Sequence, residues 1–205
     1  MYVICQFSYC LPHLSFINSQ QADALGKSLA STSISIIYAS DLLRANSTGR
    51  AVHASQDPPP PFHNNAHLRE QHFGIAEGHR WSLGKPKGKT LEECFQAKIF
   101  PVLEPEESFP EGESYLDLGK RAEKAIQECV LPHLTKENYE KDFHIALASH
   151  GLCISQLVPA TLKLDTTASE DLNVSYAGLR NTAWTRAAIT LQVQTFSPIS
   201  YVYRR

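Results

Sequence analysis

The sequence predicts a three-layer α/β/α sandwich with a mostly parallel sheet. Runs of apolar, β-branched residues alternate along the chain with segments whose apolar residues recur at helical spacing. One run, residues 143–149, is apolar almost throughout, as in a strand buried on both faces. With 205 residues, of which 42% are hydrophobic, the chain has enough apolar material for a sizeable core. We therefore expect one domain over residues 1–205.

The first half of the chain contains a predicted helix, strand and second helix. Apolar residues recur at helical spacing in residues 20–29, and the isoleucine-rich residues 33–40 predict a strand. Residues 41–55 predict the next helix, which Ser40 or Asp41 can cap. The proline-rich residues that follow, 56–65, predict a surface connection, because consecutive prolines fix φ and remove backbone donors.

The second half repeats the alternation. Six apolar residues form one stripe of an amphipathic helix, namely Leu118, Ala122, Ala125, Ile126, Cys129 and Val130. The apolar strand 143–149 follows, then a helix over 151–162 and a last strand region over 185–196. This order of elements is typical of an open α/β sheet covered by helices.

Charge and composition exclude several classes of partner. The formal net charge is −2 and no face is dense in Lys or Arg, so we expect neither a nucleic-acid nor a membrane partner. No apolar run is long enough to cross a bilayer. The five cysteines are scattered without CxxC spacing, which favours a reducing compartment and predicts a cytoplasmic protein. These residues do not indicate an oligomeric state.

Three residues whose side chains can bind an anion or transfer a proton follow predicted strands or lie in a loop. In an open α/β sheet, ligands gather at the carboxyl ends of the strands, where helix N-termini offer free N–H groups to anions. Arg44 lies in the first turn after one strand, and His150 leaves another strand, followed by Gly151. Glu70 lies in a loop rich in polar and aromatic residues. The sequence therefore predicts a site for an anion.

Four motifs in order carry a resemblance to a known family. They are SDLLRA at 40–45, LREQHFGIAEG at 68–78, GES at 112–114 and SHG at 149–151, and NTAWTR at 181–186 follows them. This series resembles the histidine phosphatase superfamily, with its phosphoglycerate mutase-like fold, from about Gln20 to Asn181. The resemblance implies hydrolysis of a small phosphorylated substrate through a phosphohistidine, without a metal or an organic cofactor. The stretches at 77–81 and 109–114 look closer to the fructose-2,6-bisphosphatase and broad-specificity branches.

The resemblance also implies roles for single residues. Arg44 and His150 would hold the transferred phosphoryl group, and Glu70 would protonate the leaving oxygen and then activate water. A bound phosphate is expected to keep His150 protonated near its reference pKa of roughly 6.5. The substrate-binding residues would be Gln71, His72, Phe73, Gly151 and Leu152.

The chain departs from the family at its N-terminus. Family members begin with an apolar strand that ends in Arg-His-Gly, whose histidine is the nucleophile, and no Arg-His-Gly occurs here. Residues 1–10 can form a strand, with Gln6, Phe7 and Ser8 near the vacant positions, so we expect a first strand that is replaced or incomplete. Cys5 and Cys10 cannot serve instead, since a cysteine phosphatase needs an Arg six positions on.

Two explanations fit the missing motif. The chain is either a truncated or alternatively spliced product of an ordinary phosphatase, which we favour, or a non-catalytic relative that binds a phospho-ligand or acts as a scaffold. In both cases we expect the chain as written to be impaired or inactive.

Two other kinds of site are disfavoured by spacing. Residues 84–90, GKPKGKT, resemble a P-loop, but only three residues separate the glycines and a proline stands where N–H groups should cradle phosphate. The histidines after the proline-rich loop lack the spacing of a metal site; they are His63, His67, His72 and His79. We therefore predict no metal. The lysines at 85, 87 and 89 are placed to meet a second phosphate or to form a solvated charge run, and we favour the charge run.

Overall fold

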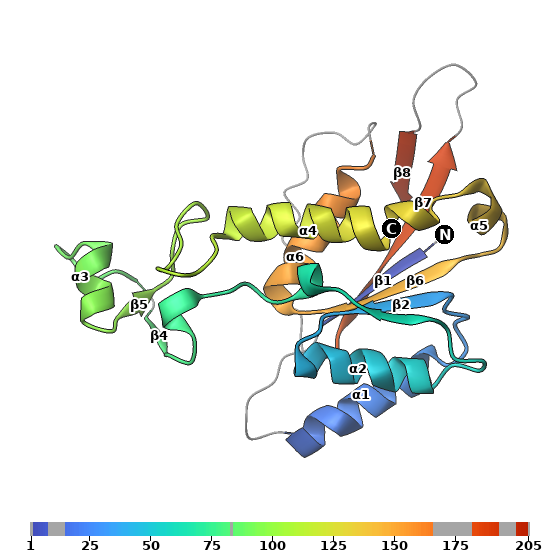
Figure 1. Ribbon diagram of the computed structural model, residues 1–205, viewed down its shortest axis with the longest axis horizontal. Coiled ribbons are helices and arrows are strands. Elements are labelled where there is room, and N and C mark those ends of the chain that lie inside the picture. The colour runs from blue at the N-terminus through green and yellow to red at the C-terminus, as the bar shows by residue number, and fades with distance from the viewer. Residues whose placement is uncertain (1, 8–14, 83, 166–181, 193–199, 205) are drawn as a thin grey trace. The chain divides into compact units, whose positions relative to one another are not determined.

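The computed structural model describes residues 2–7, 15–82, 84–165, 182–192 and 200–204 (Figure 1). It contains two compact units, each described by itself: the first comprises residues 1–70 and 121–205, and the second residues 71–120. Among the described helices, none is long and apolar enough to cross a membrane. The single domain expected over 1–205 stays a prediction.

The first unit is built on a six-stranded sheet with the order β3-β2-β6-β1-β7-β8. Its strands are β1 (Tyr2–Phe7), β2 (Ile36–Ala39), β3 (Phe62–Asn64), β6 (His144–Ser149), β7 (Trp184–Gln192) and β8 (Ser200–Arg204). The first four in sheet order are parallel, and β7 and β8 are antiparallel to their neighbours. The predicted α/β fold with a mostly parallel sheet is confirmed.

Helices cover this sheet on both faces (Figure 1). Helix α1 (Ser15–Leu29) packs on α2 (Leu43–Ala54), and α2 packs on β2 and β6. Helix α6 (Gly151–Leu162) packs on β1. All six residues of β6 are buried, which explains why this segment is apolar almost throughout.

Helix α4 (Tyr115–Cys129) begins in the second unit and ends in the first. The apolar stripe predicted from the sequence is the buried face of α4 together with Val130 just after it, and each of the six residues is at most 1% exposed. Two short helices follow it, η3 (Leu131–His133) and α5 (Lys136–Glu140).

Strand β1 occupies a central position in the sheet. It pairs in parallel with β6, from Tyr2 opposite His144 to Phe7 opposite Ser149, and antiparallel with β7. The first strand is therefore present. Its sequence, YVICQF, does not end in Arg-His-Gly, so of the two expectations the structure fits a replaced strand better than an incomplete one.

Two local predictions need correction. The prolines end at position 61, and the next three residues keep their N–H groups and pair with β2 as β3, so residues 56–65 are not wholly a surface connection. Neither Ser40 nor Asp41 caps α2, whose N-cap residue is Leu42 without a side-chain bond. Both polar side chains have other partners in the site described below.

The second unit has a small core of its own. It contains β4 (Trp81–Ser82), α3 (Leu91–Gln96), β5 (Phe100–Pro101) and the short helix η2 (Gly74–Ala76). Ala76, Phe100 and Phe109 are buried together, with Phe73, Phe95 and Leu103 packed against them.

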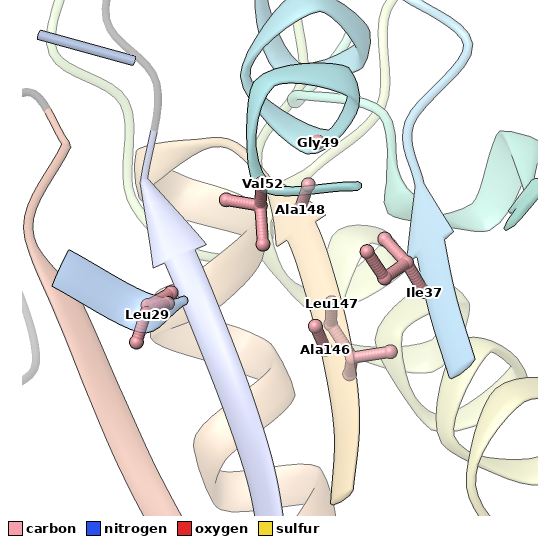
Figure 2. Close-up of a pocket in the computed structure, with 7 residues that line it drawn as sticks. All are labelled: Leu29, Ile37, Gly49, Val52, Ala146, Leu147 and Ala148. Carbon is pink, nitrogen blue, oxygen red and sulfur yellow. The ribbon is translucent and has the colours of Figure 1, made fainter. Parts of the chain in front are cut away.

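A small pocket lies beneath α2 in the first unit (Figure 2). It is lined by apolar side chains and by Gly49, where α2 approaches the sheet so closely that an added Cβ would lie 3.2 Å from those of Ala39 and Ala148. Without a polar group in its lining, this space is a packing gap in the core and offers nothing to an anion.

Candidate active site

The candidate site lies at the carboxyl ends of β2 and β6. These strands are adjacent and parallel, with Ala39 opposite Ala148, so the residues that follow each strand emerge side by side. Arg44 lies in the first turn of α2, just after β2, and His150 follows β6 directly as the N-cap of α6. Two helix N-termini therefore meet two of the predicted residues at one edge of the sheet.

His150 is held by one partner at each ring nitrogen. Arg44 Nε donates to its Nδ1 at 2.9 Å, and Ser40 Oγ lies 2.9 Å from its Nε2. Because Nδ1 accepts a hydrogen bond from Arg44, the neutral ring carries its own proton on Nε2 and donates a hydrogen bond from there to Ser40. The side chains of Ser40 and His150 are both fully buried.

The protein groups around His150 keep its ring neutral. Burial, together with the positive charges of Arg44 and Arg121, lowers the pKa of His150 to about 3, and the negative charge of Asp41 opposes this shift. The protein groups by themselves therefore disfavour the charged imidazolium that is expected beside a phosphate. Protonation would require an anion close enough to offset two guanidinium groups and the loss of water.

Glu70 follows the short helix η1 (Ala66–Leu68) and reaches the start of α6. Its Oε1 accepts from the backbone N of Cys153 at 3.2 Å, in the first turn after His150. Ser149 Oγ donates to the carbonyl of Leu68 at 2.8 Å, which ties the same loop to the end of β6. The third predicted catalytic residue thus belongs to the same edge, and its carboxylate satisfies one free N–H of the helix.

Arg121 of α4 is a site residue that the sequence reasoning missed. Its guanidinium donates to the carbonyls of His67, Arg69 and Glu70 at 2.9, 2.7 and 3.0 Å. The signal was available, since Arg121 lies three residues after Leu118 and one before Ala122, on the buried side of the amphipathic helix. A charged residue on such a stripe requires a polar partner.

Asp41 and Arg69 form a two-point ion pair across the site. Arg69 Nε and Nη2 donate to the two carboxylate oxygens of Asp41 at 2.7 and 2.5 Å. Hydrogen bonding from Arg69 is the largest cause that lowers the pKa of Asp41 below its usual value. The pair joins the turn after β2 to the loop that carries Glu70, and both residues were overlooked as partners in the sequence.

Comparison with known proteins shows the family to which the chain belongs. The family described as "Histidine phosphatase superfamily (branch 1)" matches residues 12–196. The chain belongs to this superfamily. No curated protein sequence gives a significant match.

Solved structures of several phosphatases have the same fold. A mycobacterial glucosyl-3-phosphoglycerate phosphatase is 19% identical, with a TM-score of 0.67 over 99% of this chain and 96% of that chain. The alpha-ribazole phosphatase from Shigella flexneri is 19% identical, with a TM-score of 0.60 over 99% and 95%. The ecdysone phosphate phosphatase from Bombix mori is 15% identical, with a TM-score of 0.57 over 91% and 88%. At these identities the likeness is one of fold.

The other residues predicted from the superfamily motifs fall into two groups. Gly151 and Leu152 form the first turn of α6 and are half-buried. Gln71, His72 and Phe73 belong to the second unit.

Within that unit, these three residues make local contacts. The Gln71 side chain donates to the carbonyl of Glu113 at 3.0 Å, and His72 Nδ1 lies 2.9 Å from the carbonyl of Glu111. The ring of Phe73 packs edge-on against Trp81, with 4.9 Å between centroids. Substrate binding by these residues stays a prediction.

The glycine- and lysine-rich stretch and the histidines can be described within the residues that the structure covers. Thr90 of the glycine- and lysine-rich stretch caps α3 in a capping box with Glu93, and the lysines at 85, 87 and 89 are exposed. In the described parts of the chain, no three His, Cys, Asp or Glu side chains are grouped closely enough to hold a metal ion.

Proposed function

We propose that this member of the histidine phosphatase superfamily binds a small phosphorylated molecule, or phosphate itself, at the ends of β2 and β6. One observation carries the proposal: Arg44 and His150 emerge side by side at the start of α2 and α6, where two helix N-termini favour an anion. Arg44 supplies a planar, permanently charged donor suited to phosphate oxygens.

Binding would change the state of His150. A phosphate oxygen that accepts the hydrogen bond of Arg44 Nε frees Nδ1 of His150. The negative charge of the phosphate then favours the protonated imidazole. His150 then donates to phosphate from one nitrogen and to Ser40 from the other. Structures of the mycobacterial phosphatase in complex with inorganic phosphate and with VO3 support a tetrahedral or related oxyanion as the ligand class.

We further propose that hydrolysis is slow or absent in this chain. In the superfamily pattern the nucleophile is the histidine of Arg-His-Gly, which this sequence lacks. Strand β1 ends with Phe7 opposite Ser149, one residue before His150. The next residue along the chain is Ser8, which lies outside the described residues, and a serine there lacks the imidazole that would form a phosphohistidine.

Neither residue of the buried pair can replace that nucleophile. In the proposed phosphate-bound state His150 is protonated and donates from both ring nitrogens, so it has no free lone pair with which to attack phosphorus. Ser40 would need His150 Nε2 as a general base, yet Arg44 on Nδ1 forces the proton onto Nε2. Glu70 would serve as proton donor and then as base only where a nucleophile is present.

We propose that the substrate is of the kind used by the fructose-2,6-bisphosphatase and broad-specificity phosphatase branches. We also propose a cytoplasmic location, supported by three described cysteines that are buried as thiols and form no disulfide.

Titration with orthophosphate, followed by NMR, tests the binding proposal. We expect saturable binding by the wild type and at least tenfold weaker binding by Arg44→Met. Arg50→Met is the matched control, since Arg50 is an exposed residue of the same helix, stacked on Phe62, and should retain binding. Absence of wild-type binding, or equal loss in both variants, would refute a phosphate site at Arg44.

A rebuilt motif tests the catalytic proposal. The wild type should hydrolyse an aryl phosphate slowly or not at all. The triple variant Phe7→Arg, Ser8→His, Tyr9→Gly introduces Arg-His-Gly beginning at Phe7, which pairs with Ser149, and it should gain turnover that requires His150. Wild-type turnover at a rate the triple variant does not exceed would show that the chain has another nucleophile.

A further inference from the structure

The loop that carries Glu70 has an unusual backbone. All four carbonyls of residues 67–70 accept hydrogen bonds from side chains outside the loop. Arg121 donates to three of them, at 2.7 to 3.0 Å, and Ser149 Oγ donates to the fourth at 2.8 Å. A loop whose acceptors are fixed in this way has little freedom to change its backbone angles.

The same loop ends at the candidate site. The carboxylate of Glu70 accepts from the backbone N of Cys153, three residues after His150. Since Arg121 holds the carbonyl of Glu70 itself, it also fixes the direction in which the Glu70 side chain leaves the backbone.

We propose that Arg121 is a positioning residue, which holds the backbone of residues 67–70 so that Glu70 stays on the first turn of α6 beside His150. The inference rests on the proposed phosphate site and adds a residue to it that touches neither substrate nor reacting atoms. The geometry requires a fork, because one group must reach three carbonyls. An ammonium group, as a single point donor, cannot span them.

Arg121 also contributes a charge, and this second effect can be separated from the first. Its positive charge helps to lower the pKa of His150, together with Arg44 and against Asp41. Lysine at position 121 keeps the charge and loses the fork. Methionine loses both.

Amide hydrogen exchange of Cys153 measures the positioning effect. We expect Arg121→Met and Arg121→Lys each to speed exchange of this amide about tenfold or more, relative to the amide of Leu157 in the same helix. Lys124→Met is the matched control, because Lys124 is an exposed cation on the same helix, and it should leave the ratio unchanged. Should Arg121→Met fail to fold, Arg121→Lys decides alone.

A double mutant shows whether Arg121 acts through Glu70. Glu70→Ala should speed exchange at Cys153 to the same extent, and adding Arg121→Met to it should cause no further change. Unchanged exchange in Arg121→Met, full recovery in Arg121→Lys, or additive effects in the double mutant would each overturn the positioning role.

Orthophosphate binding of the same variants separates this inference from the proposed function. We expect Arg121→Met to bind about tenfold more weakly and Arg121→Lys to bind nearly as well as the wild type, since binding depends on charge. Loss of phosphate binding in Arg121→Lys would show that binding needs the guanidinium geometry as well as the positive charge, and would overturn this distinction. If the wild type binds no phosphate, the proposed function fails while the exchange result still decides the role of Arg121.

Discussion

At the residue scale, the site depends on the state of one imidazole. His150 is fully buried, bonded at both nitrogens and close to two guanidinium groups, so the folded protein holds it neutral. In the unfolded chain the same residue regains a pKa of roughly 6.5. Folding therefore expels a proton from this position at mildly acidic pH, which links stability to pH.

Stability should therefore fall as the solution is made acidic. The depressed folded-state pKa of about 3 means that stability is fully present above roughly pH 6.5 and is lost as the pH falls from there towards 3. One such histidine changes the free energy of unfolding by up to about 1.4 kcal/mol per pH unit. Burial also lowers the pKa values of His133 and His144, which add to the same trend.

Urea unfolding between pH 7 and pH 4.5 measures this dependence. His150→Gln should show a shallower slope than the wild type, by as much as one proton. His72→Gln, at an exposed position of the second unit, should keep the wild-type slope. Equal slopes for wild type and His150→Gln would mean that His150 is not buried as a neutral group.

At the element scale, the close crossing of α1 and α2 fixes the position of α2, the helix that carries Arg44. Gly26 of α1 is buried against α2, and a Cβ added there would lie 2.4 Å from Ser55 Oγ and 2.7 Å from the carbonyl of Ala51. The backbone of α2 cannot move away without disturbing Val52, which is buried in the core. Glycine at this point sets the distance between the helices.

Gly26→Ala should destabilise the protein although alanine favours helix by about 1 kcal/mol. Overpacking of this kind costs typically about 1–3 kcal/mol, which exceeds the gain in propensity. Chemical denaturation compares it with Lys27→Ala, an exposed neighbour that should change stability by no more than about 0.5 kcal/mol. A more stable Gly26→Ala protein would show that the helices separate easily.

At the scale of the whole molecule, the chain forms two compact units with separate cores. The second unit depends on a close backbone crossing of the segments 72–74 and 110–112. Gly74 has a φ of 54°, and a Cβ there would lie 2.0 Å from the carbonyl of Pro110. No side chain can enter this crossing without moving the backbone.

Gly74→Ala should therefore loosen the second unit and leave the sheet of the first unit intact. Hydrogen exchange by mass spectrometry should show faster exchange within residues 71–120 and unchanged protection of β6. Gly78→Ala is the control, because Gly78 also has a positive φ, of 75°, but nothing within 4 Å of an added Cβ, and should cost only about 1–2 kcal/mol. Loss of protection in both units at once would show that they unfold as one.

The sequence by itself determined most elements of the sheet unit and predicted three residues of its candidate site. Helical spacing and apolar runs indicate α2, β6 and α6. A helix buried on one face repeats its apolar residues at helical spacing, and a strand buried on both faces is apolar throughout. The motif order indicates Arg44, Glu70 and His150, and the missing Arg-His-Gly is a fact of the sequence alone.

Only the tertiary structure decided how these residues are held. Arg121 and Ser40 act on residues more than 50 and 100 positions away, respectively, and no local pattern records a hydrogen bond of that range. The neutral state of His150 follows from burial and from two guanidinium groups that come from different helices. Strand β1 likewise owes its central place to pairing with β6 and β7, because a short apolar segment acquires a register only from the neighbours it meets in the folded sheet.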